Sequence, residues 1–156
     1  MADRHTRDID RPLAPAPKPL PVATVDSHAH LEIVTDAAIV KLDFQGGITA
    51  VMDFCKKVNG YVTEKEPWIL AKDEANRTEL NEVLYNTAES LRALAVLLHP
   101  VMPATTEILW ESLGANKSIG SLGAQTISGV ATWGQLPEGT IVTKTPVLFP
   151  RLEIKE

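Results

Sequence analysis

The chain of 156 residues is long enough for one domain with a tail, and its 44% hydrophobic and 22% charged residues are typical of a globular protein. A net charge of −5 counts against binding nucleic acid mainly by attraction to phosphates, although not against reading a few exposed bases. One cysteine excludes an internal disulfide and a four-cysteine zinc site, and no apolar run or secretory signal is present, so we expect a cytoplasmic protein with no membrane partner.

The N-terminal arm, residues 1–35, is predicted to be distinct from a helical domain at residues 36–156. Five of the eleven prolines fall in residues 11–21. Proline fixes φ and removes backbone donors, so this stretch is predicted to be extended. The sequence VDSHAHL follows. If it begins in a strand, His28 and His30 point to one face and could bind a divalent metal ion weakly.

A first helix is predicted to begin after Asp43, which is a suitable N-cap residue. Apolar residues recur from there at steps of three and four, which is typical of one face of a helix. A polar elbow at residues 63–67 ends the pattern, and Trp68 follows it. The apolar stripe consists of Phe44, Ile48, Val51, Met52, Cys55, Val58 and Val62.

A second helix, about residues 75–98, is the clearest element of the sequence. Pro100 ends it, because proline lacks the backbone N–H and excludes the helical conformation in the residue before it. Glu89 and Arg92 are expected to lie largely off its apolar stripe. That stripe consists of Leu80, Val83, Leu84, Thr87, Leu91, Leu94, Ala95 and Leu98.

A third helix is predicted at about residues 103–113, since Pro103 suits a first helical turn and Gly114 suits the position after a helix end. Residues 115–147 are rich in glycine, serine and threonine. They are predicted to form a loop with one short helix near residues 118–128, followed by an extended end. Helices of this length with apolar stripes predict an all-α helix bundle.

Several side chains that could carry chemistry have simpler structural interpretations. Cys55 lies on the apolar stripe and is expected to be an inert core thiol. Phe44, Leu109 and Trp110 are expected in the core. His99 lies at a helix end, where a cation suits the helix dipole, and no catalytic role is expected for it.

The stretch VDSHAHL resembles the opening strand of the TatD-type, metal-dependent deoxyribonucleases, over about residues 10–36. In that family an H-x-H motif supplies two metal ligands, which implies this role for His28 and His30. The other ligands would come from later strands of a barrel that needs about 250 residues. The only other histidines of the sequence are His5 and His99. A fragment of such a hydrolase is an alternative hypothesis.

A longer stretch, residues 42–153, resembles the C-terminal anticodon-binding domain of methionyl-tRNA synthetases. The resemblance implies an all-α bundle of the class I synthetase type, which recognises a tRNA anticodon stem-loop as a module of a methionine–tRNA ligase. The matching pieces are collinear. They are VNGYVTEKEPWILAKD (58–73), VLYNTAESLRALAVLLHPVMP (83–103), LW…LG (109–114), ATWGQLPEGTIV (131–142) and LFPRLE (148–153).

The same resemblance implies a role for Trp68, and Asn59, Tyr61 and Lys72 belong to the same motif. In that family the tryptophan of the E-P-W segment stacks on an anticodon base, and Trp68 occupies this position here. Stacking on an unpaired base contributes roughly 1–3 kcal/mol. Asn59 and Tyr61 could orient the elbow or reach RNA, and Lys72 could contact a phosphate. The competing interpretations are a core plug beneath the elbow for Trp68 and structural or solvated roles for the other three.

The sequence lacks the H-I-G-H and K-M-S-K-S signatures of the family's ATP-dependent catalytic domain. This chain alone is therefore not expected to catalyse aminoacylation or to need ATP, and a separate catalytic domain is a candidate partner. The family's anticodon-reading helix before residue 42 is expected to be missing, because the proline-rich arm occupies its place. Its loss should leave part of the bundle's apolar surface uncovered, which favours marginal stability or self-association. An inactive helical fragment is a third hypothesis.

Overall fold

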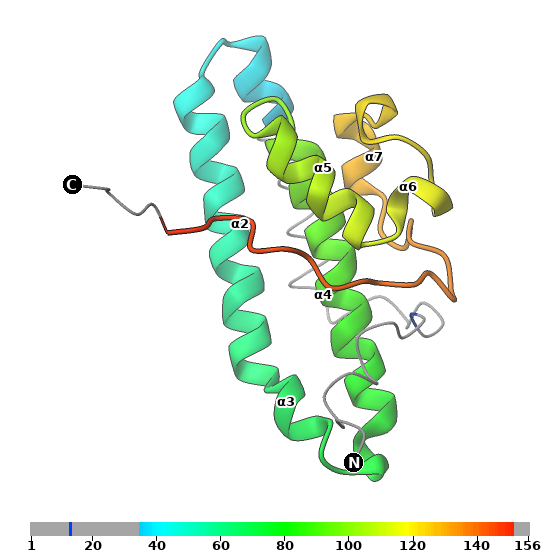
Figure 1. Ribbon diagram of the computed structural model, residues 1–156. Coiled ribbons are helices and arrows are strands. Elements are labelled where there is room, and N and C mark those ends of the chain that lie inside the picture. The colour runs from blue at the N-terminus through cyan, green and yellow to red at the C-terminus, as the bar shows by residue number, and fades with distance from the viewer. Residues whose placement is uncertain (1–12, 14–34, 152–156) are drawn as a thin grey trace, which may run out of the picture.

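The computed structural model describes Leu13 and residues 35–151. Two long helices lie side by side and antiparallel, a short helix joins them at one end, and the later helices pack around the second (Figure 1). The described residues contain no strand, so the predicted all-α class is confirmed. The elements are α2 (Phe44–Lys65), α3 (Pro67–Leu70), η1 (Glu74–Asn76), α4 (Arg77–Leu98), α5 (Pro103–Ser112), α6 (Ala115–Ser118), η2 (Leu122–Ala124) and α7 (Ile127–Ala131).

Helix α2 begins where the sequence predicted. The Asp43 carboxylate accepts a hydrogen bond from the backbone N–H of Gly46 at 2.9 Å, which satisfies one of the free donors of the first turn. A short helical segment at residues 35–40 precedes α2. A short helix thus stands before residue 42, but residues 27–43 contain neither an asparagine nor an arginine, the two residue types with which the family's helix was expected to read the anticodon.

Only part of the predicted apolar stripe of α2 is buried. Val51 and Val58 are buried, together with Phe54, which was not in the predicted stripe. Phe44 is 66% exposed, so its predicted place in the core is wrong. The face of α2 that meets α4 is centred on residues spaced by three and four from Phe54. Phe44 lies on the shoulder of that face, where no described element covers it.

Helix α4 is the central element, because α2, α3, α5 and α7 all pack against it. Almost every side chain from Tyr85 to Leu97 is buried, including those of Glu89 and Arg92. The expectation that these two lie away from the buried side of the helix is therefore wrong. A helix that is covered all round has no water-facing side, so an amphipathic pattern cannot assign one to its polar residues.

The predicted third helix is confirmed as α5, and Gly114 follows its C-cap residue Leu113 in the left-handed region with φ of 68°. A Cβ atom at Gly114 would lie 2.5 Å from the carbonyl oxygen of Ile141, so the chain can pass there only at a glycine. Trp110 of α5 is fully buried, as predicted, and its indole N–H donates to the Gly120 carbonyl at 2.9 Å.

An extended C-terminal segment, residues 137–151, crosses the helices and is fixed at two places. Its Thr143 N–H donates to the Ser112 carbonyl at the end of α5, at 2.8 Å. Leu13 of the N-terminal arm exchanges two hydrogen bonds of 2.9 Å with the backbone of Gly139 and Thr140, and its side chain is buried in the core. Leu13 thus belongs to the folded body.

Candidate nucleic-acid interface

The elbow between α2 and α4 presents the tryptophan that the sequence singled out. Glu66 ends α2 in the left-handed region with φ of 43°, and Pro67 starts α3 immediately after it. The carbonyl of Glu66 accepts the backbone N–H groups of Ile69 at 2.7 Å and Leu70 at 3.2 Å. Trp68 is 53% exposed on this single helical turn, so the core-plug interpretation of its side chain is wrong.

Short-range contacts hold the part of the elbow that leads from α3 into α4. The Asp73 carboxylate accepts from the Ala75 N–H at 3.0 Å and caps the η1 turn that leads into α4. The Lys65 ammonium lies 3.3 Å from the Glu79 carboxylate, which links the last turn of α2 to the first turn of α4. An exposed ion pair of this kind contributes at most about 1 kcal/mol to stability, so it favours this geometry of the elbow only weakly.

Tyr61, near the end of α2, forms a contact between the two long helices. The side-chain amide of Asn86, buried on α4, donates to the Tyr61 hydroxyl at 3.3 Å. Burial raises the pKa of Tyr61, and the hydrogen bond from Asn86 partly opposes this, so the phenol is neutral at physiological pH. The Tyr61 side chain thus links α2 to α4 through Asn86.

The two other predicted RNA-contacting residues are exposed. Asn59 is exposed on the surface of α2. Lys72 lies four residues after Trp68, in the turn that ends α3. Its ammonium is exposed and forms no ion pair with the described residues.

Charge around the elbow is unfavourable to a polyanion. Two of its three cations, Lys65 and Arg77, already pair with carboxylates. Any attraction for RNA must therefore come from stacking and local contacts rather than from a basic field. The acidic residues of residues 64–79 are Glu64, Glu66, Asp73, Glu74 and Glu79.

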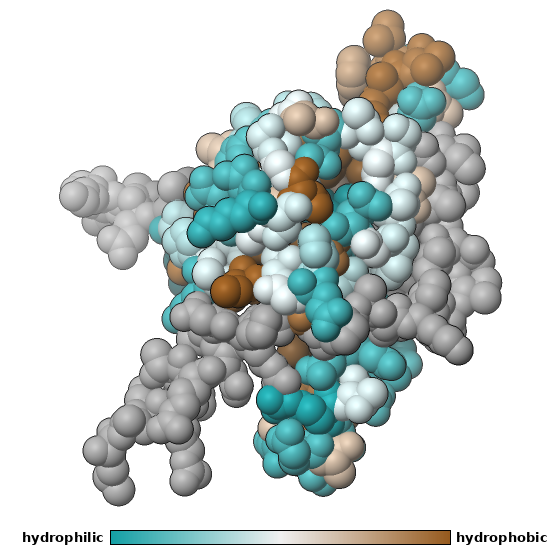
Figure 2. Space-filling model, turned by 90° about the vertical axis from the view of Figure 1, so that its right-hand side faces the viewer, coloured by the Kyte–Doolittle hydropathy of each residue, from teal (hydrophilic) through white to brown (hydrophobic). Residues whose placement is uncertain are grey.

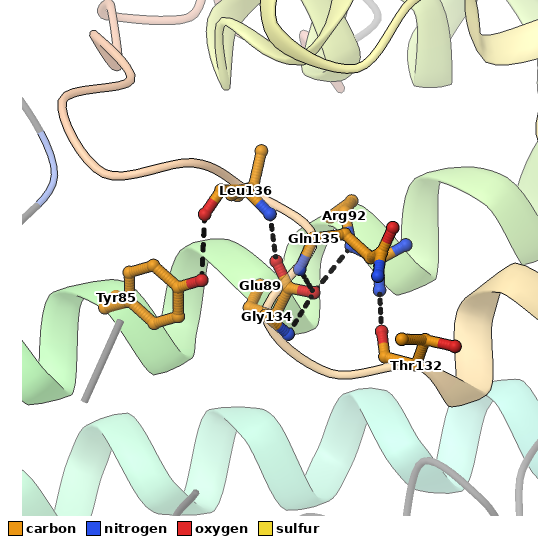
Figure 3. A network of polar contacts seen from close by, with 7 residues as sticks. All are labelled: Tyr85, Glu89, Arg92, Thr132, Gly134, Gln135 and Leu136. Atoms are coloured by element: carbon orange, nitrogen blue, oxygen red, sulfur yellow. Dashed lines mark hydrogen bonds and ion pairs between the residues drawn. The ribbon is translucent and has the colours of Figure 1, made fainter. Parts of the chain in front are cut away.

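A second polar centre, which sequence reasoning missed, lies within the body of the molecule. Glu89 of α4 is fully buried, and its carboxylate binds a loop more than forty residues away in the sequence (Figure 3). One oxygen accepts the backbone N–H groups of Gly134 at 3.1 Å and Gln135 at 3.0 Å, and the Nε–H of Arg92 at 2.8 Å. The other oxygen accepts the N–H of Leu136 at 3.2 Å.

Tyr85 and Arg92 complete this network. The Tyr85 hydroxyl donates to the Leu136 carbonyl at 2.9 Å, and an Arg92 guanidinium N–H donates to the Thr132 carbonyl at 3.1 Å (Figure 3). Burial, reinforced by the negative charge of Glu89, raises the pKa of Tyr85 to about 12. The network fastens residues 132–136 to α4. Because the Glu89 carboxylate is fully buried and both of its oxygens accept hydrogen bonds from the chain, its role is structural.

The remaining sequence candidates have structural places. His99 joins the end of α4 to α5, with Nδ1 at 3.0 Å from the Thr106 hydroxyl and Nε2 at 3.9 Å from the Glu107 carboxylate. Cys55 is half-buried beside the core. No group of three or more potential metal ligands occurs among the described residues, and His28 and His30 lie outside them. In the part of the chain that is described, no helix is long and apolar enough to cross a membrane.

Comparison with known proteins identifies the family of this chain. A family model described as the anticodon-binding domain of tRNA ligase matches residues 27–126, which is more than half of the chain. The chain belongs to this family. The match to the anticodon-binding family includes His28 and His30, which the sequence analysis placed in a TatD-type opening, and it does not extend to residues 127–153 of the predicted resemblance.

Relatives of this anticodon-binding domain are methionine–tRNA ligases. The enzyme of Streptomyces coelicolor is 51% identical over 148 residues, which cover 87% of this chain and 28% of that protein. The enzyme of Halalkalibacterium halodurans is 38% identical over 119 residues, covering 76% of this chain and 17% of that protein. The chain thus spans less than a third of the length of these relatives.

A solved structure supports the fold of the domain. The apo form of Mycobacterium tuberculosis methionyl-tRNA synthetase superposes with a TM-score of 0.78 over 92% of this chain and 28% of that chain. Its sequence identity in this superposition is 21%, so the match concerns the fold alone.

Proposed function

We propose that this domain docks a tRNA anticodon stem-loop and that Trp68 stacks on one of its unpaired bases. The observation that carries the proposal is the exposed indole on α3, held between a left-handed helix end and the start of α4. A ring on a fixed single turn loses little conformational freedom on binding, and its π-face accepts any base. Stacking of this kind contributes roughly 1–3 kcal/mol.

We further propose that the tRNA is that of methionine and that aminoacylation requires a catalytic domain outside this sequence. The identity of 51% to a methionine–tRNA ligase supports the choice of tRNA. The absence of the H-I-G-H and K-M-S-K-S signatures from this sequence supports a division of labour in which ATP is bound elsewhere. The chain's own contribution is recognition of the stem-loop.

The neighbouring residues have supporting roles in this proposal. Lys72 contacts a phosphate beside the stacked base, because its ammonium pairs with no carboxylate of the described residues. Tyr61 keeps α2 and α4 in register above the elbow through its contact with Asn86. Asn59, exposed on α2, is close enough in sequence to the elbow to offer an amide to the loop.

The test is fluorescence anisotropy of a labelled stem-loop carrying the methionine anticodon. We expect Trp68→Ala to weaken binding by about 5- to 150-fold, the range that corresponds to 1–3 kcal/mol, and Trp68→Phe to retain part of the affinity. Phe149→Ala is the matched control, because Phe149 is 69% exposed and belongs to the C-terminal segment. Equal affinity of the Trp68→Ala variant and the parent chain would remove Trp68 from the account.

The TatD-type alternative depends on His28 and His30. Both lie outside the described residues, so a metal site there stays a prediction, which metal uptake tests independently of RNA binding.

A further inference from the structure

The elbow contains a backbone conformation that most residue types avoid. Glu66 has φ of 43° and ψ of 58°, in the left-handed region. There the Cβ atom of an L-residue lies too close to the following carbonyl oxygen, so glycine is favoured. Pro67 restricts the residue before it still further, because its Cδ atom crowds the preceding N–H and Cβ. A glutamate at this position is therefore strained, and such strain persists only where the surrounding structure holds it.

Both backbone groups of Glu66 take part in holding this conformation. Its N–H donates to the Val62 carbonyl at 3.1 Å, which closes the last turn of α2. Its carbonyl accepts the N–H groups of Ile69 at 2.7 Å and Leu70 at 3.2 Å, which form the single turn of α3. The chain thus leaves α2 and enters α3 at one residue. A change in the φ of Glu66 would break one set of these hydrogen bonds and turn α3 away from its present direction.

Few other contacts fix the direction of α3. Among the described residues, no side chain of residues 66–72 forms a hydrogen bond or an ion pair. Helix α3 contacts α4, and Pro67 and Leu70 are half-buried. Trp68 and Ile69 are exposed, and the face of this end of the molecule that Figure 2 shows is mostly hydrophilic. The direction of the indole therefore depends largely on the backbone at residue 66.

We propose that Glu66 is a positioning residue for the stem-loop, because its left-handed backbone holds α3 in the orientation that presents Trp68 to the unpaired base. The inference rests on the proposed function and adds the residue that determines the direction of the indole. The role belongs to the backbone of Glu66 and not to its carboxylate, since this exposed side chain forms no ion pair that could hold the elbow to the described residues.

Substitutions at residue 66 separate the backbone from the side chain. Proline fixes φ at about −65°, so Glu66→Pro excludes the left-handed conformation and removes the N–H that the Val62 carbonyl accepts. Valine is β-branched and strongly disfavours positive φ, so Glu66→Val opposes the conformation and keeps the N–H. Glycine adopts the conformation without strain. Glutamine has the same stem as glutamate but lacks its charge, so Glu66→Gln tests the carboxylate alone.

Fluorescence anisotropy of the full chain with the methionine anticodon stem-loop measures the effect. We expect Glu66→Pro to weaken binding as much as Trp68→Ala does, by about 5- to 150-fold. Glu66→Val should weaken binding by roughly threefold or more. Glu66→Gly and Glu66→Gln should retain the parent affinity to within about twofold, since the backbone conformation stays accessible to both. Circular dichroism checks that each variant is folded, and Glu66→Val carries the test if Glu66→Pro is not.

Leu42 provides a matched control. It is the other non-glycine residue with positive φ among those described, at 58°, and it is 73% exposed. It lies at the opposite end of the 22 residues of α2, which span about 33 Å at a rise of 1.5 Å per residue. Leu42→Pro and Leu42→Val impose the same backbone changes there and should leave stem-loop affinity within about twofold of the parent value.

A double variant distinguishes positioning from a general effect on stability. In a Trp68→Ala background, Glu66→Val should cause no further loss of affinity, because Glu66 acts through Trp68 alone. A further loss there would overturn the inference, as would a loss in Glu66→Gln or Glu66→Gly as large as that in Glu66→Val. If Trp68→Ala weakens binding and Glu66→Val and Glu66→Pro do not, this inference fails alone. Parent affinity in Trp68→Ala would refute the proposed function itself, and this inference with it.

Discussion

Replacing Glu89 by glutamine is the sharpest test of the buried network. The carboxylate accepts three backbone N–H groups and the Arg92 side chain, and both charged residues are almost completely buried. In Glu89→Gln the side-chain NH₂ group replaces one carboxylate oxygen. It then faces N–H donors that have lost their acceptor. The guanidinium of Arg92 loses its counter-charge in a place that water does not reach. Breaking a buried pair from one side costs about 3–5 kcal/mol, so we expect a loss of that order in the free energy of unfolding.

Urea unfolding followed by circular dichroism measures this loss. With a slope of about 1–3 kcal/mol per molar urea, the midpoint should fall by roughly 1 M or more. Glu82→Gln is the matched control, because Glu82 is exposed on the same helix and its loss should stay within about 0.5 kcal/mol.

Hydrogen exchange distinguishes the network from a general weakening. The N–H groups of Gly134 and Gln135 should lose protection in Glu89→Gln before the amides of α4 do, because Glu89 is their acceptor. Since Glu89 and Arg92 act together, the losses in Glu89→Gln and Arg92→Met should not add in the double variant. A stability change in Glu89→Gln as small as that in Glu82→Gln would refute the reasoning.

Three further predictions concern pH, RNA and metal. Tyr85 keeps its proton to about pH 12 in the folded chain but loses it near pH 10.0 when unfolded. The free energy of unfolding should therefore be full below pH 10 and fall as the pH rises toward 12. Tyr85→Phe should flatten this fall in alkaline unfolding curves, and an unchanged curve would contradict the prediction. Lys72→Ala should reduce the salt dependence of stem-loop binding by about one phosphate contact, a slope change of roughly 0.7 in log Kd against log salt, and an unaltered slope would exclude the contact. If His28 and His30 bind metal, the chain should take up one Zn²⁺ in calorimetric titration and His28→Ala should abolish the uptake; a parent chain without stoichiometric uptake would end the TatD-type alternative.

Signals that act within a few residues were sufficient for the three longer helices α2, α4 and α5, but not for the short helical turns. Asp43 caps α2 because a first helical turn needs a side-chain acceptor, and Gly114 follows α5 because the left-handed backbone after a helix end favours glycine. Trp68 was located because the elbow around it is a short, recognisable motif between two strongly periodic helices. Its exposure agrees with that interpretation, and its contact with RNA stays a proposal.

The burial of polar and apolar side chains was decided by the tertiary structure. Phe44 continues the apolar stripe of α2, yet it is exposed because the contact with α4 is centred on Phe54. Glu89 and Arg92 were predicted to lie off the apolar stripe, yet they are buried because residues 132–136 return to the far side of α4 and supply hydrogen-bond partners from the backbone. Periodicity records which residues share a face of one helix. Whether that face meets water depends on segments distant in sequence, whose positions only the folded chain defines.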